Sequence, residues 1–320
     1  MTRPNEIEDL VRDENFWFDD GNVVITSGTI GWKIHKSVLS RSSPAFREFF
    51  AVTPTDGIDQ RYGCPVVILE DHPDDIRLLL RALYDGRHLR AAWARFNVIA
   101  AWVRMGAKYR IDDLRDGGLR RLESCFCDNM YQWDLVSYEP PELRFYGITL
   151  HWRDCIATVN LARIANTQSA LPLAMYVCCT LDTRTLLNGI EYTRGRVEKL
   201  DEADIVRCLD ARPKFMVLQQ QIVDNLARVE RYLDGYPDIG DHAHCMRAFR
   251  RIADAIRAGR PSAWNGDPEG GKYDVLQSWK PAIEKEGAGL CELCREKIIA
   301  ADAEERMKVW LQLPKLLGLR

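Results

Sequence analysis

The sequence lacks several features that would place it in a common functional class. Acidic and basic residues nearly balance, with 47 Asp and Glu against 44 Lys and Arg, so the formal net charge is −3. No broad basic field is therefore available to hold nucleic acid or an anionic membrane. No run of 18 apolar residues is present, which argues against a membrane-spanning helix. The first residues, MTRPNEIEDLVRDENF, have neither the basic start nor the apolar core of a secretory signal.

Motifs that cradle phosphate or activate a nucleophile are also missing. Gly117-Gly118 and Gly270-Gly271 lack the spaced glycines and following Lys-Ser/Thr of a P-loop, and neither pair fits G-x-G-x-x-G. The serines that follow His35 are not part of a G-x-S-x-G elbow. We therefore expect no catalytic residues, no enzyme activity and no small-molecule substrate.

The composition is that of a folded protein. Hydrophobic residues make up 46% of the 320 residues and charged residues 28%, which is typical of globular chains. The length favours about two domains. Most of the ten cysteines stand singly in apolar helical contexts. Without an export signal they are interpreted as reduced, buried thiols, which favours an intracellular protein of the cytoplasm or nucleus.

The N-terminal part begins with strand patterns. Residues 22–27, NVVITS, form a β-branched run that ends at a Ser-Gly turn. In residues 29–36, TIGWKIHK, apolar side chains alternate with others, as expected for a strand with one buried face. The two segments predict an antiparallel hairpin. A third short strand is expected at residues 65–69.

Two helices are expected around these strands. Ser43 can cap a helix that Pro44 begins, because proline has no N–H to leave unpaired at the first position. A second helix starts at Pro73 with acidic residues in its first turn, and ends at Asp85-Gly86. Apolar side chains at helical spacing give each helix one buried stripe. The expected structural residues are His35, Ser43, Pro44, Phe46, Phe50, Leu79, Leu80 and Leu83.

These segments together resemble the BTB/POZ fold. The resemblance is carried by FWFDDGNVVI, WKIHKSVLSRSSPAFREFF, DDIRLLLRALY and AKYRIDDLR. The sequence of these motifs is similar to that of a large fungal, basidiomycete-like group of BTB proteins, which carry a long helical region after the domain. The resemblance implies an α+β fold in which a small sheet packs on helices. It places an N-terminal segment at 1–14, the domain at 15–125, a packed connector at 126–154 and an all-α region at 155–320.

The resemblance implies a non-enzymatic adaptor for protein–protein interaction. Its partners would be a second copy of the chain or another protein. The alternative is that the chain is itself the substrate receptor of a cullin-type ubiquitin ligase, with a cullin as its partner. Dimers in the family place an Asp and a basic residue in a charged pocket, and the matching positions here hold Asn22 and Lys36. Cullin binding would involve the loop at residues 51–63, whose large apolar residues are Ile58 and Tyr62.

The second half is dominated by helical patterns. Acidic residues at 201–204 open a segment at 205–209, and a longer pattern runs from Phe215 to Leu233. Cys245 shares a predicted apolar face with Phe249, Ile252 and Ile256. No internal repeat is evident.

One cysteine pair has the spacing of half a metal site. Cys291 and Cys294 are separated by two residues, and thiolates at this spacing can share one zinc ion. The stretch DHAHC at residues 241–245 supplies three possible ligands, His242, His244 and Cys245. His242 and Cys245 could complete a tetrahedron, giving a zinc-containing regulatory protein as a further alternative. The same spacing also places two thiols at i and i+3 on one face of a helix, where they would pack in the core. Core packing is the favoured interpretation. A redox C-x-x-C is the remaining option. We therefore expect no cofactor, with a structural zinc ion as the alternative.

Overall fold

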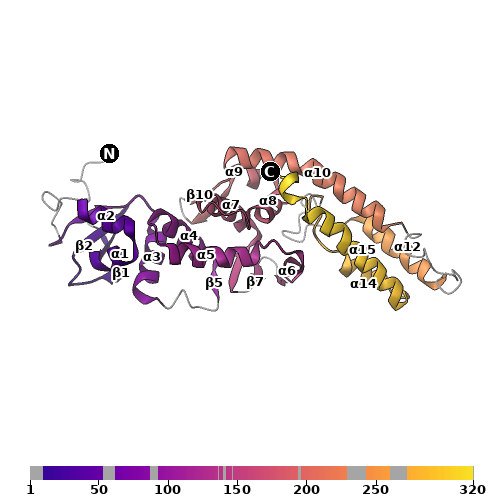
Figure 1. Cartoon of the computed structure of the whole chain (residues 1–320), viewed down its shortest axis with the longest axis horizontal. Helices are drawn as coiled ribbons and strands as arrows, with labels where there is room; N and C mark the ends of the chain where they lie inside the picture. The colour runs from indigo at the N-terminus through magenta and orange to yellow at the C-terminus, as the bar shows by residue number, and fades with distance from the viewer. Residues whose placement is uncertain are drawn as a thin grey trace. The chain divides into compact units, whose positions relative to one another are not determined.

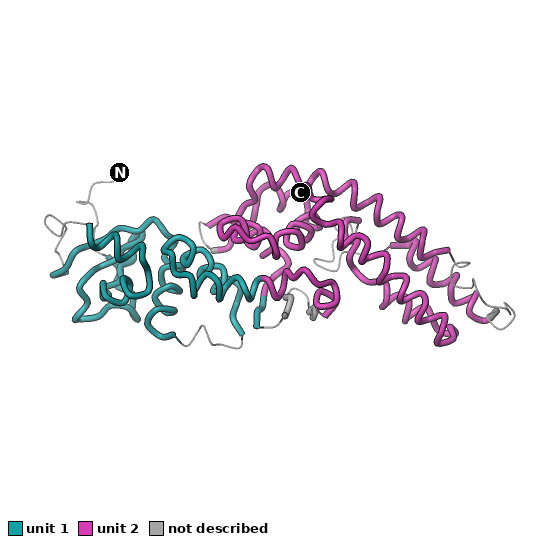
Figure 2. The backbone as a smooth tube through the Cα atoms, viewed as in Figure 1, with its two compact units in different colours: residues 1–122, 146–149 teal, residues 123–145, 150–320 magenta. Residues whose placement is uncertain are grey.

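The computed structural model describes most of the chain in two compact units. Unit 1 comprises residues 1–122 and 146–149, and unit 2 comprises residues 123–145 and 150–320 (Figure 2). Among the described residues, no helix is long and apolar enough to cross a membrane. The described residues are 10–52, 62–86, 93–135, 137–139, 142–145, 147–193, 196–228, 243–259 and 272–319.

Unit 1 begins with a four-stranded sheet in the order β1-β3-β2-β4. The predicted antiparallel hairpin is confirmed, because β2 pairs with β3 in the register Ser27↔Ile30. Gly28 in the turn has φ 56°, a left-handed conformation that glycine adopts without strain. The strands are β1 (Val11–Trp17), β2 (Val23–Ser27), β3 (Ile30–Ile34) and β4 (Val66–Ile68).

Strand β1 is a feature that the sequence analysis did not predict. It runs parallel to β3 at one edge of the sheet. Its side chains do not alternate, since the buried ones are Asp13 and Phe16. The buried Asp13 carboxylate accepts a hydrogen bond of 2.8 Å from Arg77 Nε on α3. A polar residue therefore occupies an inward position, which hides the strand from a search for alternating apolar residues.

Helices cover the sheet of unit 1 (Figure 1). Helix α3 starts at Pro73 and ends at Asp85, as predicted, and Gly86 closes it with φ 59°. Trp32, Phe46, Leu79 and Leu80 are buried in one core cluster, against which Phe50 and Leu83 are partly buried. The remaining elements are α1 (Lys36–Ser42), α2 (Pro44–Val52), α3 (Pro73–Asp85), β5 (Ala94–Arg95), α4 (Phe96–Lys108), α5 (Asp112–Cys125) and β8 (Ile148–His151), with β5 parallel to β8.

Unit 2 is helical apart from short strands. Its core includes Tyr176, Phe215, Phe249 and Trp279, all fully buried. The segments predicted at 205–209 and from Phe215 onward are one helix, α10, which continues through Pro213. Pro213 is exposed, so water can bind the carbonyl group that its missing N–H leaves unpaired.

The elements of unit 2 alternate helices with two short antiparallel strand pairs, β6–β7 and β9–β10. They are α6 (Met130–Asp134), β6 (Ser137–Glu139), β7 (Glu142–Phe145), a 3₁₀ turn (Trp152–Asp154), α7 (Cys155–Ile164), α8 (Leu171–Cys179), α9 (Thr183–Asn188), β9 (Ile190–Thr193), β10 (Arg196–Glu198), α10 (Glu202–Leu226), α12 (Ala243–Ala258), α14 (Lys280–Glu286), α15 (Glu292–Trp310) and α16 (Leu313–Leu316).

Candidate functional sites

His35 lies where β3 turns into α1, and both of its ring nitrogens are engaged. Nδ1 is 3.0 Å from the hydroxyl of Tyr84, and Nε2 is 3.2 Å from Asp20 Oδ1. The His35 backbone N–H also donates to the Tyr84 hydroxyl at 3.0 Å. Tyr84 stacks on Phe18, with ring centroids 5.1 Å apart. The imidazole therefore joins the strand, α3 and the preceding turn, which is a structural arrangement.

Ser43 fixes the start of α2. Its Oγ accepts the Phe46 backbone N–H at 3.0 Å and donates to the Tyr109 carbonyl at 2.6 Å. Pro44 is the first residue of the helix. Phe46 stacks on the Tyr109 ring with centroids 4.3 Å apart, and the Tyr109 hydroxyl donates to Asp71. Burial, together with this carboxylate, raises the pKa of Tyr109 far above its usual value.

The structure brings Asn22 and Lys36 together through the backbone of the lysine. Asn22 Oδ1 accepts a hydrogen bond of 2.8 Å from the Lys36 N–H at the start of α1. The Lys36 ammonium lies 5.8 Å from the centroid of the Phe50 ring. Asn22 thus positions the helix start, while the lysine charge is directed to an aromatic face.

The loop at 51–63 supplies two candidate residues, Ile58 and Tyr62. Ile58 lies outside the described residues. Tyr62 is partly buried and packs edge-to-face on Trp17, with ring centroids 5.4 Å apart. It belongs to a small cluster with Leu10, Val24 and Cys64. A partner that touched Tyr62 would therefore also meet the β1 side of the sheet.

An apolar group at the end of α2 is exposed. Val52 is 77% exposed and Phe49 is 40% exposed. These residues lie at i and i+3 on one helix face, and the Phe49 ring is 5.5 Å from that of Phe50. We call Phe49, Phe50, Val52 and the adjacent Lys36 the α2 patch. The sequence analysis placed the apolar residues of this helix in a buried stripe and did not single out Val52.

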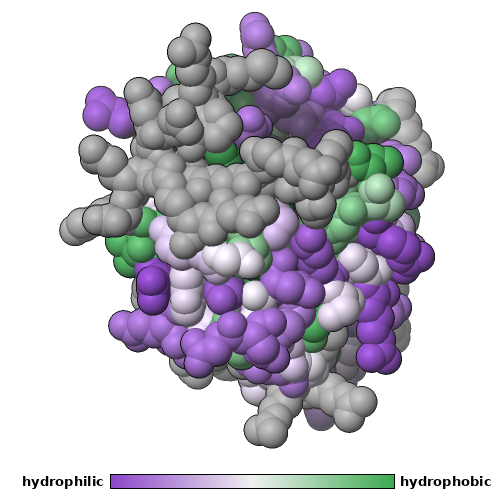
Figure 3. All heavy atoms as spheres, turned by 90° about the vertical axis from the view of Figure 1, so that its left-hand side faces the viewer, coloured by the Kyte–Doolittle hydropathy of each residue, from purple (hydrophilic) through white to green (hydrophobic). Residues whose placement is uncertain are grey.

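Figure 3 shows the hydropathy of one face of the molecule. Described hydrophobic residues form small separate areas among hydrophilic ones (Figure 3). Scattered exposed apolar residues are normal on a folded protein, whereas larger contiguous apolar patches mark interaction sites.

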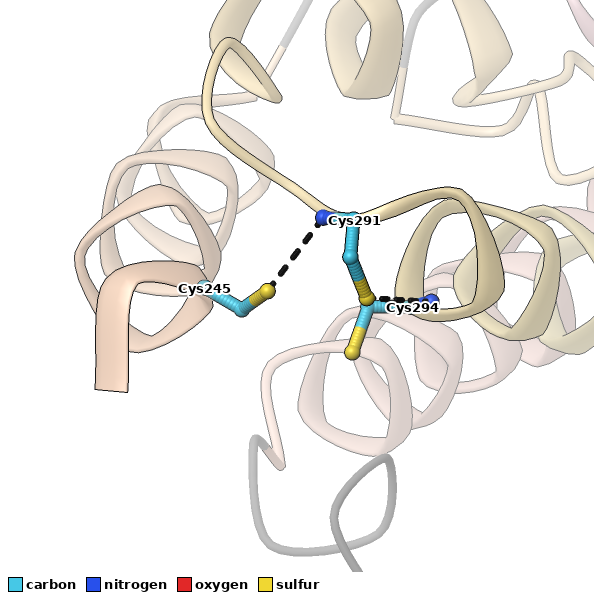
Figure 4. Close-up of side chains that lie close together, drawn as sticks. All are labelled: Cys245, Cys291 and Cys294. Atoms are coloured by element: carbon cyan, nitrogen blue, oxygen red, sulfur yellow. Dashed lines mark hydrogen bonds between the residues drawn. The ribbon is translucent and has the colours of Figure 1, made fainter. Parts of the chain in front are cut away.

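Three of the cysteines converge in unit 2. The Sγ atoms of Cys245, Cys291 and Cys294 all lie within 4.8 Å of one another. Cys245 comes from the start of α12, whereas Cys291 caps α15 and Cys294 lies in its first turn (Figure 4). Cys245 and Cys294 are fully buried, and Cys291 is partly buried. We call this group the cysteine cluster.

Backbone N–H groups surround the cysteine cluster. The Cys291 N–H lies 3.3 Å from Cys245 Sγ, and the Cys294 N–H lies 3.5 Å from Cys291 Sγ (Figure 4). The Cys294 N–H lowers the pKa of Cys291, while burial and the neighbouring thiols raise that of Cys294 to about 12.

Histidines precede Cys245 in the sequence. His244 Nε2 is 3.3 Å from Cys245 Sγ. His242, which the sequence analysis named as a ligand, lies outside the described residues. His244 is therefore the described histidine that lies beside Cys245.

Other cysteines lie in the core of unit 2. Cys155 Sγ is 3.2 Å from Cys178 Sγ, and Cys179 Sγ is 3.7 Å from the carbonyl oxygen of Cys208. All four are fully buried between α7, α8 and α10. None of the ten cysteines, all in the described part, is in a disulfide.

Comparison with known proteins identifies the class of the first unit. Residues 13–117 match the BTB/POZ domain family. No curated protein matches the chain. The chain therefore carries a BTB/POZ domain made of a small sheet and helices. BTB/POZ domains mediate protein–protein interactions and are typically not enzymes.

Proposed function

We propose that this protein is a non-enzymatic adaptor that associates with a second copy of itself through its BTB/POZ domain. The observation that carries the proposal is the α2 patch, an exposed apolar group on the domain that matches an interaction family. Burial of Phe49 and Val52 in an interface would remove apolar surface from water, which is the main driving force of association.

The size of the patch indicates the kind of association. A stable interface buries on the order of 1,200–2,000 Å² in total, more than a few side chains supply. Polar residues around the apolar side chains must therefore take part, among them Lys36 of the patch and Asn22, which accepts the Lys36 N–H. A polar rim around a small apolar centre favours a reversible, concentration-dependent dimer.

The histidine best placed for catalysis supports the non-enzymatic part of the proposal. A general base must reach the proton that it abstracts. The ring nitrogens of His35 face Tyr84 and Asp20, which tie the corner of the fold together. The ring is thus committed to structure.

Recruitment of another protein to the same patch is the second form of this function. A cullin scaffold is one such partner, and the family resemblance implies that it would contact the loop at 51–63. We also infer that the chain belongs to the fungal group of BTB proteins, which the helical unit 2 supports. Its reduced thiols support a place in the cytoplasm or nucleus.

The test is the molar mass of the full chain in solution, measured by light scattering over a wide range of concentrations. The proposal predicts a mass that rises from 36.8 kDa toward twice that value. A mass that stays at 36.8 kDa at every concentration would contradict self-association. Mixing with a purified cullin amino-terminal domain then tests the second form, which predicts a complex of one chain with one cullin.

A further inference from the structure

We propose that the three thiols of the cysteine cluster bind a structural zinc ion, with His244 as the fourth ligand. The site does not depend on the proposed adaptor function, because it lies wholly within unit 2. Its role would be to join the first turn of α12 to the first turn of α15.

The distances within the cluster fit a tetrahedral metal. Zn–S bonds of about 2.3 Å place sulfur atoms roughly 3.8 Å apart, and a Zn–N bond of about 2.0 Å places nitrogen roughly 3.5 Å from sulfur. The three sulfurs already lie within 4.8 Å of one another. His244 Nε2 is 3.3 Å from Cys245 Sγ. Side-chain adjustments of about an ångström, and a reorientation of His244 toward the other two sulfurs, would complete the site.

The surroundings supply hydrogen-bond donors that metal-bound thiolates can use. Two backbone N–H groups point at cluster sulfurs, one at 3.3 Å and one at 3.5 Å. N–H donors of this kind orient metal-bound thiolates and stabilise their charge. Both helices also begin at the cluster, so the positive ends of their dipoles face the ligands.

The chemistry of the ligands selects zinc among common ions. Thiolate and imidazole groups are the usual ligands of closed, four-coordinate structural zinc sites. Magnesium and calcium require oxygen ligands, which are not among the four groups. A site with four protein ligands has no open position for substrate, so the ion would stabilise the fold and would not catalyse a reaction.

The site would close a long stretch of chain. Cys245 and Cys291 are 46 residues apart, and the segment between them includes α14. A metal that binds the folded state and not the unfolded one adds its binding free energy to stability. Removal of the metal should therefore loosen the starts of α12 and α15 before other parts of unit 2.

The experiment measures zinc in the full chain purified under reducing conditions and dialysed against metal-free buffer. Elemental analysis should find one zinc ion per chain. In a variant with Cys291→Ser and Cys294→Ser together, zinc content should fall at least about tenfold. Cys127→Ser is the matched control, since Cys127 is buried in the same unit and its thiol bonds to the Asn129 carbonyl, which a hydroxyl can replace. This control should retain the metal.

A second measurement does not depend on the folding of the variants. Co²⁺ alone is titrated into the wild-type chain after removal of metal. The account predicts a thiolate-to-cobalt charge-transfer band that saturates at one equivalent and is displaced by Zn²⁺. His244→Ala should bind Co²⁺ more weakly than the wild type does, whereas His242→Ala should bind Co²⁺ with wild-type affinity. The reverse pattern would overturn the assignment of the fourth ligand.

Three results would overturn the site itself. Zinc content that is the same in the double variant and the wild type would show adventitious metal. Absence of both zinc and a cobalt band in the reduced wild-type chain would show that the thiols only pack. A Cys291–Cys294 disulfide, detected by protection from alkylation in protein isolated without reductant, would assign the pair to redox chemistry.

Discussion

Arg306 and Asp134 form a bidentate ion pair although they are 172 residues apart. The two guanidinium-to-carboxylate distances are 2.6 and 3.0 Å, and the pair joins α15 to the short helix α6 within unit 2. Arg306 Nε lies 3.3 Å from Asp302, and the arginine side chain is almost fully buried. Although burial lowers the pKa of Arg306, the two aspartates more than offset this and raise it, so the arginine stays charged.

Replacement of Arg306 by methionine should destabilise unit 2 strongly. The substitution leaves Asp302 buried without its charged partner, and loss of one member of a buried pair costs about 3–5 kcal/mol. Urea denaturation followed by circular dichroism measures the effect. Arg257→Met is the control, because Arg257 forms an exposed pair with Asp254. The account is wrong if the two variants lose similar stability.

The contribution of Asp154 to the stability of unit 2 should increase as the pH falls from about 6 to about 4. Burial raises the pKa of Asp154 from 3.8 to about 6, against the opposing effect of hydrogen bonds from the Tyr192 hydroxyl and the His151 N–H. The folded state therefore favours the protonated carboxyl, whose contribution is complete below pH 3.8 and lost as the pH rises through 6. A shift of this size corresponds to about 3 kcal/mol.

Asp154→Asn isolates this contribution from that of other titrating groups. The asparagine cannot ionise. As the pH falls from 7 to 5, the wild type should therefore gain stability relative to this variant, as measured by urea midpoints. Asp254→Asn, at an exposed site, should follow the wild type. A wild-type curve parallel to that of Asp154→Asn would show that Asp154 titrates normally.

Gly118→Ala should destabilise unit 1, whereas Gly117→Ala should not. A Cβ atom on Gly118 would lie 2.7 Å from Val103 Cγ2 on α4, and overpacking of this kind costs about 1–3 kcal/mol. A Cβ on Gly117 would meet only the end of Arg120 at 3.8 Å, so the substitution should add about 0.5–1 kcal/mol of helix stability. Thermal melts of the two variants give the comparison. Equal melting temperatures would contradict the close approach of α4 and α5.

The sequence predicts elements whose local signals agree with the fold. The β2–β3 hairpin has alternating residues and a turn glycine, and α3 has a proline start, an apolar stripe and a terminal glycine. Strand β1 could not be found in this way, because its buried Asp13 is stabilised by Arg77, which is distant in sequence. The segments predicted separately at 205–209 and from Phe215 onward are joined in α10, on which Cys208, Ala211 and Phe215 are all buried.

Local sequence patterns likewise reveal only part of the candidate sites. The C-x-x-C spacing is local and was visible in the sequence, as was Cys245 as a candidate. The convergence of these residues depends on the packing of α14 against both α12 and α15, which no local pattern encodes. Likewise, exposure of Val52 depends on where α2 ends relative to the sheet.

The central claim is that the BTB/POZ domain acts through the α2 patch. Its most direct test compares the concentration-dependent molar mass of the wild type with those of Val52→Glu and Leu311→Glu. Val52 is 77% exposed on the patch and Leu311 is 74% exposed in unit 2, so each substitution adds one charge at a similarly accessible site. We predict that Leu311→Glu dimerises as the wild type does, and that the dimer of Val52→Glu is at least about tenfold weaker, a difference of about 1.4 kcal/mol. Equal dimerisation of all three proteins would contradict the claim.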